Sequence, residues 1–197
     1  MSVRGFTVVE LMVVVAIVAI FLALAVPSYN GVITQNRMAS EINDLANAMS
    51  LARSGAIRQG VNVTICASTN PTAAKPSCSG NSNWSTGWIL FTDVASNQTY
   101  NTSSGDTLLG IHGALQNNDT LTGSTGAVGA YSGSVASVTF NRMGATIGAD
   151  NLTTTTFDVL TLHDSANTLA WRRCLLVSEV GTSQISTQTQ NPGDDCP

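Results

Sequence analysis

The sequence predicts an α+β protein, in which a long N-terminal helix packs on an antiparallel β-sheet or sandwich. Three observations favour this class. Residues from Leu11 to Pro27 form an unbroken apolar run, and an apolar stripe at helical spacing follows it. The rest of the chain holds short strand-like segments separated by Ser, Thr, Gly and Asn. Because these segments follow one another without intervening helices, an antiparallel arrangement is favoured over a parallel one.

We expect one helix from Phe6 to Gln59, about 80 Å long at the usual rise of 1.5 Å per residue. Pro27 should kink this helix rather than end it, because the apolar pattern resumes beyond it. Gly60 is a natural C-terminal stop. The first half of such a helix needs lipid or other helices around it, and the second half needs a sheet. The stripe that would face the sheet comprises Met38, Ile42, Leu45, Met49, Ala52 and Ala56.

Strands are expected where apolar and polar residues alternate or where β-branched and aromatic residues gather. These segments are residues 61–66, 87–93, 156–162, 170–177 and 183–187, with a hairpin of 135–140 and 145–147. Residues 70–83 should form a loop closed by Cys78. Residues 97–133 are rich in Ser, Thr, Gly and Asn, and a single short strand, 108–111, is expected there.

Length and composition restrict the class of protein further. A chain of 197 residues is one domain plus an appendage by the usual length prior. Only 10% of the residues are charged, which fits a β-rich extracytoplasmic domain better than a cytosolic enzyme. The net charge of −4 argues against a broad nucleic-acid surface. His112 and His163 lie far apart among scattered aspartates, so no catalytic set is indicated and we expect no enzyme and no cofactor.

The cysteines predict disulfides rather than a metal site. Cys66, Cys78, Cys174 and Cys196 form no C-x-x-C pair, which gives zinc poor support. An even count in an oxidising compartment favours two disulfides. Of the three possible pairings we favour the sequence-local one, Cys66–Cys78 and Cys174–Cys196, with each loop stabilising by roughly 3 kcal/mol. The alternative is four reduced, buried thiols.

The N-terminus carries the most informative motif. Gly5-Phe6-Thr7-Val8-Val9-Glu10 opens the apolar run with a single acid. This segment resembles the start of type IV pilins and type II secretion pseudopilins. The resemblance implies that prepilin peptidase cleaves after Gly5 and that the new Phe6 amine is methylated. The alternatives are a plain membrane anchor or a secretory signal peptide, which would be cut near residues 23–25 and lost.

The same resemblance implies the organisation of the chain. Residues 1–5 would be a leader, 6–30 the transmembrane and assembly half of the helix, and 31–197 a periplasmic domain that includes the amphipathic half, 31–59. Arg4 without a flanking acid places the leader in the cytoplasm. The chain would cross the bacterial inner membrane once before assembly and belong to a pilus or pseudopilus afterwards. Its partners would be other minor pilins and the major pilin through the helix, prepilin peptidase and the inner-membrane assembly platform.

Glu10 is the candidate assembly residue. A carboxylate inside a membrane segment costs roughly 2.5–3.5 kcal/mol or more, so such an acid suggests a functional role. The resemblance implies a salt bridge from Glu10 to the Phe6 amine of a neighbouring subunit, or of its own. Pairing offsets the desolvation that each charge suffers alone and would set the axial register between subunits. The alternative is an acid that snorkels to the membrane surface.

A finer resemblance points to the GspH/FimT/FimU group of pilin-like proteins. It is carried by the helix end at residues 51–60, the strand 63–66, the W-x-x-G-W segment 84–93 and the hairpin 139–144. It implies a minor pilin of the FimU kind, which helps to start or cap a type IV pilus. The first alternative is a type II secretion pseudopilin of the GspH kind.

A second alternative, a DNA-binding competence pilin of the FimT kind, is disfavoured. Such members carry a Gly-Arg-x-Arg element near the C-terminus, whereas residues 180–184 here keep Gly181 and lack both arginines. Phosphate contacts need cations, and Arg172 and Arg173 are the remaining candidates. We therefore do not expect DNA as a partner. Trp84 and Trp88, which would share one side of a strand, could form a stacking platform, but core packing is the preferred interpretation.

Overall fold

A single long helix opens the chain. The computed structural model describes residues 5, 7–127, 130–147, 156–187 and 196. Helix α1 spans Val8–Gln59 and continues through Pro27, which therefore does not end it. The chain divides into two compact units, Met1–Arg37 and Met38–Pro197, and we call the second the head domain. In the part of the chain that the structure describes, no helix has both the length and the apolar content for a membrane crossing.

The apolar stripe of the helix is buried in the head domain, as the periodicity predicts. Its members, Met38, Ile42, Leu45, Met49, Ala52 and Ala56, are each at most 2% exposed. The charged Glu41 is also buried in the head domain, at 7% exposed. At the helix end, Gly60 has a φ of 69° and its N–H donates to the Ala56 carbonyl at 2.9 Å. This left-handed residue is the predicted C-terminal stop.

Two five-stranded antiparallel sheets form the rest of the described head domain. The first has the order β3-β2-β1-β6-β7, with β1 at Val63–Ala67, β2 at Trp88–Thr92, β3 at Leu108–His112, β6 at Ser137–Phe140 and β7 at Thr146–Ile147. The second has the order β10-β9-β8-β4-β5, with β4 at Thr120–Ala127, β5 at Ala130–Ser134, β8 at Thr156–His163, β9 at Arg173–Ser178 and β10 at Ser183–Thr187. Short 3-10 helices lie at Thr102–Ser104 and Leu169–Trp171.

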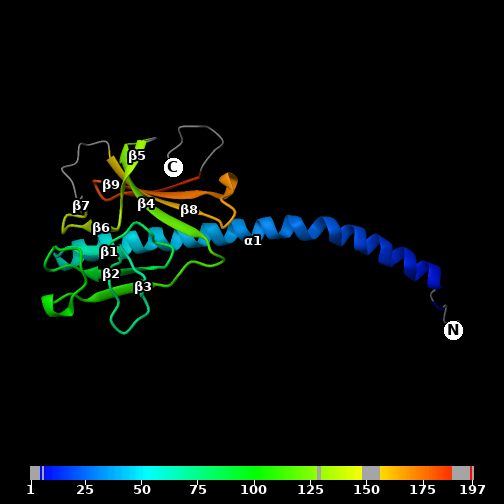
Figure 1. The fold of residues 1–197 in the computed structure, drawn as a ribbon, viewed down its shortest axis with the longest axis horizontal. Coiled ribbons are helices and arrows are strands. Elements are labelled where there is room, and N and C mark those ends of the chain that lie inside the picture. Colours follow the sequence, from blue (N-terminus) through cyan, green and yellow to red (C-terminus); the bar gives the residue numbers. More distant parts are fainter. Residues whose placement is uncertain (1–4, 6, 128–129, 148–155, 188–195, 197) are drawn as a thin grey trace. The chain divides into compact units, whose positions relative to one another are not determined.

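The helix packs against both sheets at once. The largest core cluster joins the helix stripe to inward residues of the first sheet, such as Ile65 and Leu90, and of the second, such as Leu160 and Leu175. Figure 1 shows the C-terminal half of α1 running along the strands of the head domain. The predicted α+β fold, a long helix on an antiparallel β domain, is therefore confirmed.

The strand predictions miss one hairpin. Residues 97–133 contain β4 and part of β5 besides the expected β3. Their Gly-, Ser- and Thr-rich sequence does not predict this hairpin, because the hairpin depends on close backbone packing rather than on the burial of apolar side chains. A Cβ atom on Gly123 would collide with the Val135 carbonyl oxygen and would lie 2.9 Å from Trp84 Nε1. The glycine is needed for this close approach, and glycine otherwise weakens a strand prediction.

The start of β9 also differs from the prediction. Residues 170–177 were expected to be extended, yet Leu169–Trp171 form a 3-10 turn and β9 begins at Arg173. Asp164 accepts hydrogen bonds from the Thr168 N–H at 2.6 Å and its hydroxyl at 3.0 Å. These hydrogen bonds close the turn of residues 164–168, which leads into the 3-10 helix, and β9 begins only after that helix.

Candidate assembly site and surface grooves

Glu10 lies in the first turn of α1, where the backbone is capped by Thr7. The Glu10 N–H donates to Thr7 Oγ1 at 3.2 Å, and the Leu11 N–H donates to the Thr7 carbonyl at 3.2 Å. Thr7 is thus the N-cap residue, and Glu10 stands at the third helical position, the spacing of a capping box. An acid there is also favoured by the helix dipole. The T-x-x-E spacing is a sequence signal that reasoning from the membrane pattern alone overlooked.

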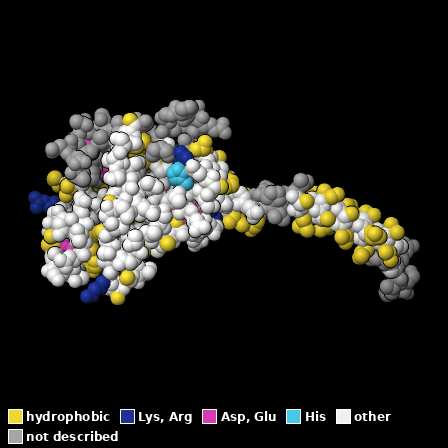
Figure 2. Space-filling model, in the orientation of Figure 1, with side chains coloured by type: hydrophobic (Ala, Val, Ile, Leu, Met, Phe, Trp, Pro, Cys, Tyr) yellow, Lys and Arg dark blue, Asp and Glu magenta, His cyan; other side chains and the backbone are white. Residues whose placement is uncertain are grey.

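The side chains around Glu10 are exposed and mostly apolar. Glu10 and Gly5 are exposed, while Phe6 lies outside the described residues. Large apolar side chains from Val8 to Leu22 are 48–75% exposed, and Figure 2 shows hydrophobic side chains all along this part of the helix. An apolar surface of this extent marks a site of contact with lipid or with other proteins. Glu10 is the one charged residue of this described segment, 7–23.

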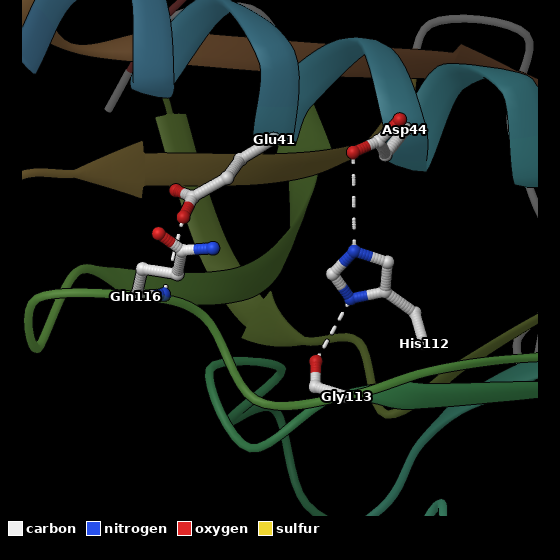
Figure 3. A network of polar contacts seen from close by, with 5 residues as sticks. All are labelled: Glu41, Asp44, His112, Gly113 and Gln116. Atoms are coloured by element: carbon white, nitrogen blue, oxygen red, sulfur yellow. Dashed lines mark hydrogen bonds and ion pairs between the residues drawn. The ribbon is translucent and has the colours of Figure 1, made fainter. Parts of the chain in front are cut away.

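Polar contacts attach the packed half of α1 to β3 and to the loop that follows it (Figure 3). The Gln116 N–H donates to Glu41 Oε1 at 3.2 Å. His112 Nδ1 lies 2.8 Å from the Gly113 carbonyl oxygen, and His112 Nε2 lies 4.0 Å from Asp44 Oδ2. Because a carbonyl oxygen can only accept, Nδ1 carries the hydrogen in this contact. The buried Glu41 therefore has a structural contact within the head domain.

Neither tryptophan offers an open stacking face. Trp84 is fully buried before β2 begins, so the expectation that both tryptophans share a strand is wrong, and its Nε1–H donates to the Val135 carbonyl at 2.8 Å. Trp88 is 2% exposed and stacks on the His112 ring, with centroids 3.9 Å apart and planes within 2°. The core-packing interpretation of both residues is confirmed.

The cysteines form the sequence-local pairs, Cys66–Cys78 and Cys174–Cys196, with Cα atoms 5.6 and 5.5 Å apart. Each pair belongs to a small apolar cluster that is separate from the main core. Cys66 and Cys78 pack with Ile89 and Phe91 of the first sheet. Cys174 and Cys196 pack with Val159 and Leu176 of the second sheet. Since neighbouring strand residues face opposite sides, the first disulfide fastens the loop between β1 and β2 over the outer face of the first sheet, and the second holds Cys196 against the outer face of the second sheet.

Arg172 and Arg173 do not form a paired basic site. Arg172 follows the 3-10 turn, and its Nη2 donates to Asn167 Oδ1 at 3.0 Å, an oxygen that also contacts His163 Nδ1. Arg173 begins β9 between Leu162 and Thr187 of the flanking strands. The turn from β9 to β10, which holds Gly181, lies instead beside the end of α1 and borders a groove of about 460 Å³ with Arg53. No pattern in the sequence predicts that groove.

Comparison with known proteins decides the family. The family described as Type II transport protein GspH matches residues 41–181, more than half of the chain, and the prokaryotic N-terminal methylation motif matches residues 1–26. The chain belongs to the GspH family. This assignment unites the long exposed helix, the capped Glu10 and the two-sheet head domain in one pilin-like subunit.

Solved structures agree with the fold of this GspH-family chain. The type IV minor pilin FimU of Pseudomonas aeruginosa, in crystals of space group P65, has a TM-score of 0.53 and 17% identity over 80% of this chain and 98% of FimU. In space group P21 the TM-score is 0.55 and the identity 19%, over 81% of this chain and 96% of FimU. At such identities the likeness shows the fold alone. No curated protein sequence matches the chain.

Proposed function

We propose that this chain is a minor pilin of the FimU kind, which helps to initiate or cap a type IV pilus together with other minor pilins. Its fold is that of FimU, and its first 26 residues match the methylation motif. The observation that carries the proposal is a lone carboxylate, Glu10, in the first turn of an exposed apolar helix. Such a helix is suited to bury its apolar side chains first in lipid and then among neighbouring helices.

The N-terminus supports a proposed order of processing, membrane insertion and assembly for the subunit. Prepilin peptidase would cleave after Gly5, and the new Phe6 amine would be methylated. Before assembly, residues 6–30 would anchor the chain in the bacterial inner membrane, with the leader in the cytoplasm and the domain of residues 31–197 in the periplasm. The assembly platform would then move the subunit into the filament.

Within the filament, Glu10 would pair with the Phe6 amine of a neighbouring subunit or of its own. In a low-dielectric helix bundle, two opposite charges attract far more strongly than in water. An unpaired carboxylate in the same place would be strongly disfavoured. The pairing therefore selects one axial position of the helix, whereas apolar packing alone would tolerate several.

Glu10→Gln and Glu10→Ala distinguish this pairing from the capping of α1. Gln can still occupy the third position of a capping box but carries no charge, whereas Ala can do neither. If the charge pair directs assembly, both variants are processed and membrane-bound, yet each reaches sheared pilus fractions about tenfold less than the wild type, the ratio that corresponds to about 1.4 kcal/mol. Immunoblots of whole membranes and sheared filaments measure this ratio. Wild-type incorporation of Glu10→Gln beside failure of Glu10→Ala would contradict the pairing and leave capping as the role of Glu10.

The GspH family match favours a second candidate, a minor pseudopilin of a type II secretion system. Both candidates use the same helix, so the residues do not separate them. Deletion of the chain does. Deletion of a pilus subunit removes surface pili and leaves protein secretion intact. Deletion of a pseudopilin removes protein secretion and leaves surface pili in place. Pilus yield and the secreted protein fraction, measured in one deletion strain, decide between the two.

A further inference from the structure

The groove at the end of α1 is bordered by two elements that are distant in sequence. Its volume is about 460 Å³. The helix contributes Met49, Ser50, Arg53, Ser54 and Ile57, and the turn between β9 and β10 contributes Gly181, Thr182 and Ser183. Half of these residues are hydroxyl-bearing, and Arg53 is the one charged residue among them.

Close backbone contacts fix the shape of this groove. Gly181 has a φ of 76°, and a Cβ atom there would collide with the Gly144 carbonyl oxygen. Gly144 has a φ of 83°, and a Cβ atom there would lie 3.0 Å from Arg53 Nε. The Gly181 N–H donates to the Ser178 carbonyl at 2.8 Å. The β9–β10 turn therefore packs tightly against α1 and against the hairpin of β6 and β7. This packing makes the groove a preformed feature.

Arg53 brings to the groove a charge that no acid of the described residues pairs with. Its side chain is half-buried, and Nη2 donates to the Val180 carbonyl oxygen at 3.2 Å. Nε is buried without a hydrogen-bond partner, and within the described residues Arg53 forms no ion pair. A partly desolvated cation beside a neutral carbonyl gains from an anion that can accept from its remaining N–H groups.

The character of the groove selects the kind of anion. Nucleic-acid backbones require several cations, whereas this groove holds one, in a chain of net charge −4. A single carboxylate matches one guanidinium in charge and in its forked geometry. The surrounding hydroxyls can donate to the same carboxylate. Ile57, which is 52% exposed, offers apolar contact to the stem of the incoming side chain.

We propose that this groove binds an Asp or Glu side chain of a neighbouring pilin subunit, with Arg53 as the anchoring cation. The proposal rests on the proposed function, because it needs a filament neighbour. Residues 49–57 lie in the last three turns of α1, at the C-terminal end of the helix. The neighbour would therefore meet the head domain at this end.

Site-specific photo-crosslinking tests the occupant in cells that make filaments. A benzophenone amino acid replaces Ile57 in the full chain, and a matched strain carries it at Ile111, which is 51% exposed and borders another groove. We expect adducts with another pilin from position 57, at a peptide that contains Asp or Glu. The Ile111 strain should not label that peptide. Absence of adducts from position 57, or adducts only at segments without an acid, overturns the proposal.

Arg53 variants made in the Ile57 crosslinking chain test the charge. Arg53→Lys keeps the cation, while Arg53→Gln keeps a donor for Val180 and removes the charge. We expect Arg53→Gln to lower the adduct yield at least about tenfold and Arg53→Lys to retain most of it. Equal yields from all forms overturn the proposal. Melting curves of each purified full chain in detergent show whether a variant has lost its fold. If Arg53→Gln has lost its fold, Arg53→Lys alone decides, because its adduct yield must stay high.

Two controls separate this proposal from the proposed function. If the wild-type chain is absent from sheared filaments, the proposed function fails. If it is present and Arg53→Gln leaves the adducts unchanged, only the groove proposal fails. A gel shift of the wild-type chain with a 30-bp duplex gives the remaining outcome: binding that Arg53→Gln abolishes would assign the groove to nucleic acid and overturn the carboxylate.

Discussion

Asp158 shows how a single carboxylate can work against the stability of the head domain. It lies within β8, between Thr125 of β4 and Val177 of β9. Burial raises its pKa from 3.8 to about 6, against a hydrogen bond with Thr125 that lowers the pKa. Asp93, by contrast, accepts hydrogen bonds from the Thr64 hydroxyl and from the N–H groups of Asn97 and Gln98. The buried Asp93 therefore organises a loop, whereas Asp158 is poorly solvated.

The raised pKa of Asp158 predicts a pH dependence with a definite sign. The folded chain binds this proton more tightly than the unfolded chain, so the group adds no penalty below pH 4 and destabilises fully above pH 6. Asp158→Asn should raise the free energy of unfolding by about 3 kcal/mol at pH 7.5 and change it little at pH 4. Urea denaturation at both pH values measures this difference. An equal effect of the substitution at pH 7.5 and at pH 4 would contradict the raised pKa of Asp158.

At the scale of elements, glycines and disulfides fix the positions of loops and turns that strand pairing does not fix. The two disulfides hold Cys78 and Cys196 against the outer faces of the two sheets, while α1 covers both inner faces. Gly181 and Gly144 bring the β9–β10 turn against the hairpin of β6 and β7. The Thr146 N–H also donates to the Glu179 carbonyl at 2.8 Å, which links these two turns directly.

Gly181→Ala tests the seating of the β9–β10 turn, with Gly105→Ala as its matched control. Both glycines have positive φ, 76° and 85°, so each substitution should cost about 1–2 kcal/mol in backbone strain. Only Gly181 has a backbone oxygen in the way, whereas nothing lies within 4 Å of a Cβ atom on Gly105. Gly181→Ala should therefore lower the denaturation midpoint clearly more than Gly105→Ala. Equal losses would show that the turn can shift without cost.

At the scale of the whole molecule, the two units have different sources of stability. The head domain buries the helix stripe between two sheets. The described apolar side chains of the first unit, such as Val8 and Phe21, are exposed at 75% and 69% and have no core of their own. The first unit therefore depends on a surrounding of lipid or other helices, whereas the head domain can be stable in water.

Two truncations test this division. Removal of residues 1–30 leaves the whole stripe in place, so the remaining chain should unfold cooperatively in water. Removal of residues 1–45 takes away Met38, Ile42 and Leu45, each at most 2% exposed. Losing each buried side chain costs about 2–5 kcal/mol, and the sum approaches the 5–15 kcal/mol that typically holds a domain. The shorter chain should lack near-ultraviolet circular dichroism and a melting transition. A cooperative transition in it would contradict the role of the stripe.

Local chemistry made much of this protein predictable. The helix, its stripe, its glycine stop and the hairpin of β6 and β7 repeat patterns that the sequence carries within a few residues. Where Ala170 was expected to be extended, the chain forms a 3-10 turn that directly follows the turn closed by Asp164. The hairpin of β4 and β5 escaped prediction because its Gly123 serves a close contact with Trp84, which is distant in the chain. The T-x-x-E cap at Thr7 was readable but was overlooked beside the membrane pattern.

The sequence by itself determined the processing motif, the lone acid of the apolar helix and the family resemblance, since each depends on residues that are adjacent along the chain. Only the tertiary structure decided that Trp88 stacks on His112, that Glu41 is buried, and that Arg53 meets the β9–β10 turn. These contacts join residues 24 to 127 positions apart. Packing of distant elements, which no local pattern encodes, brings them together.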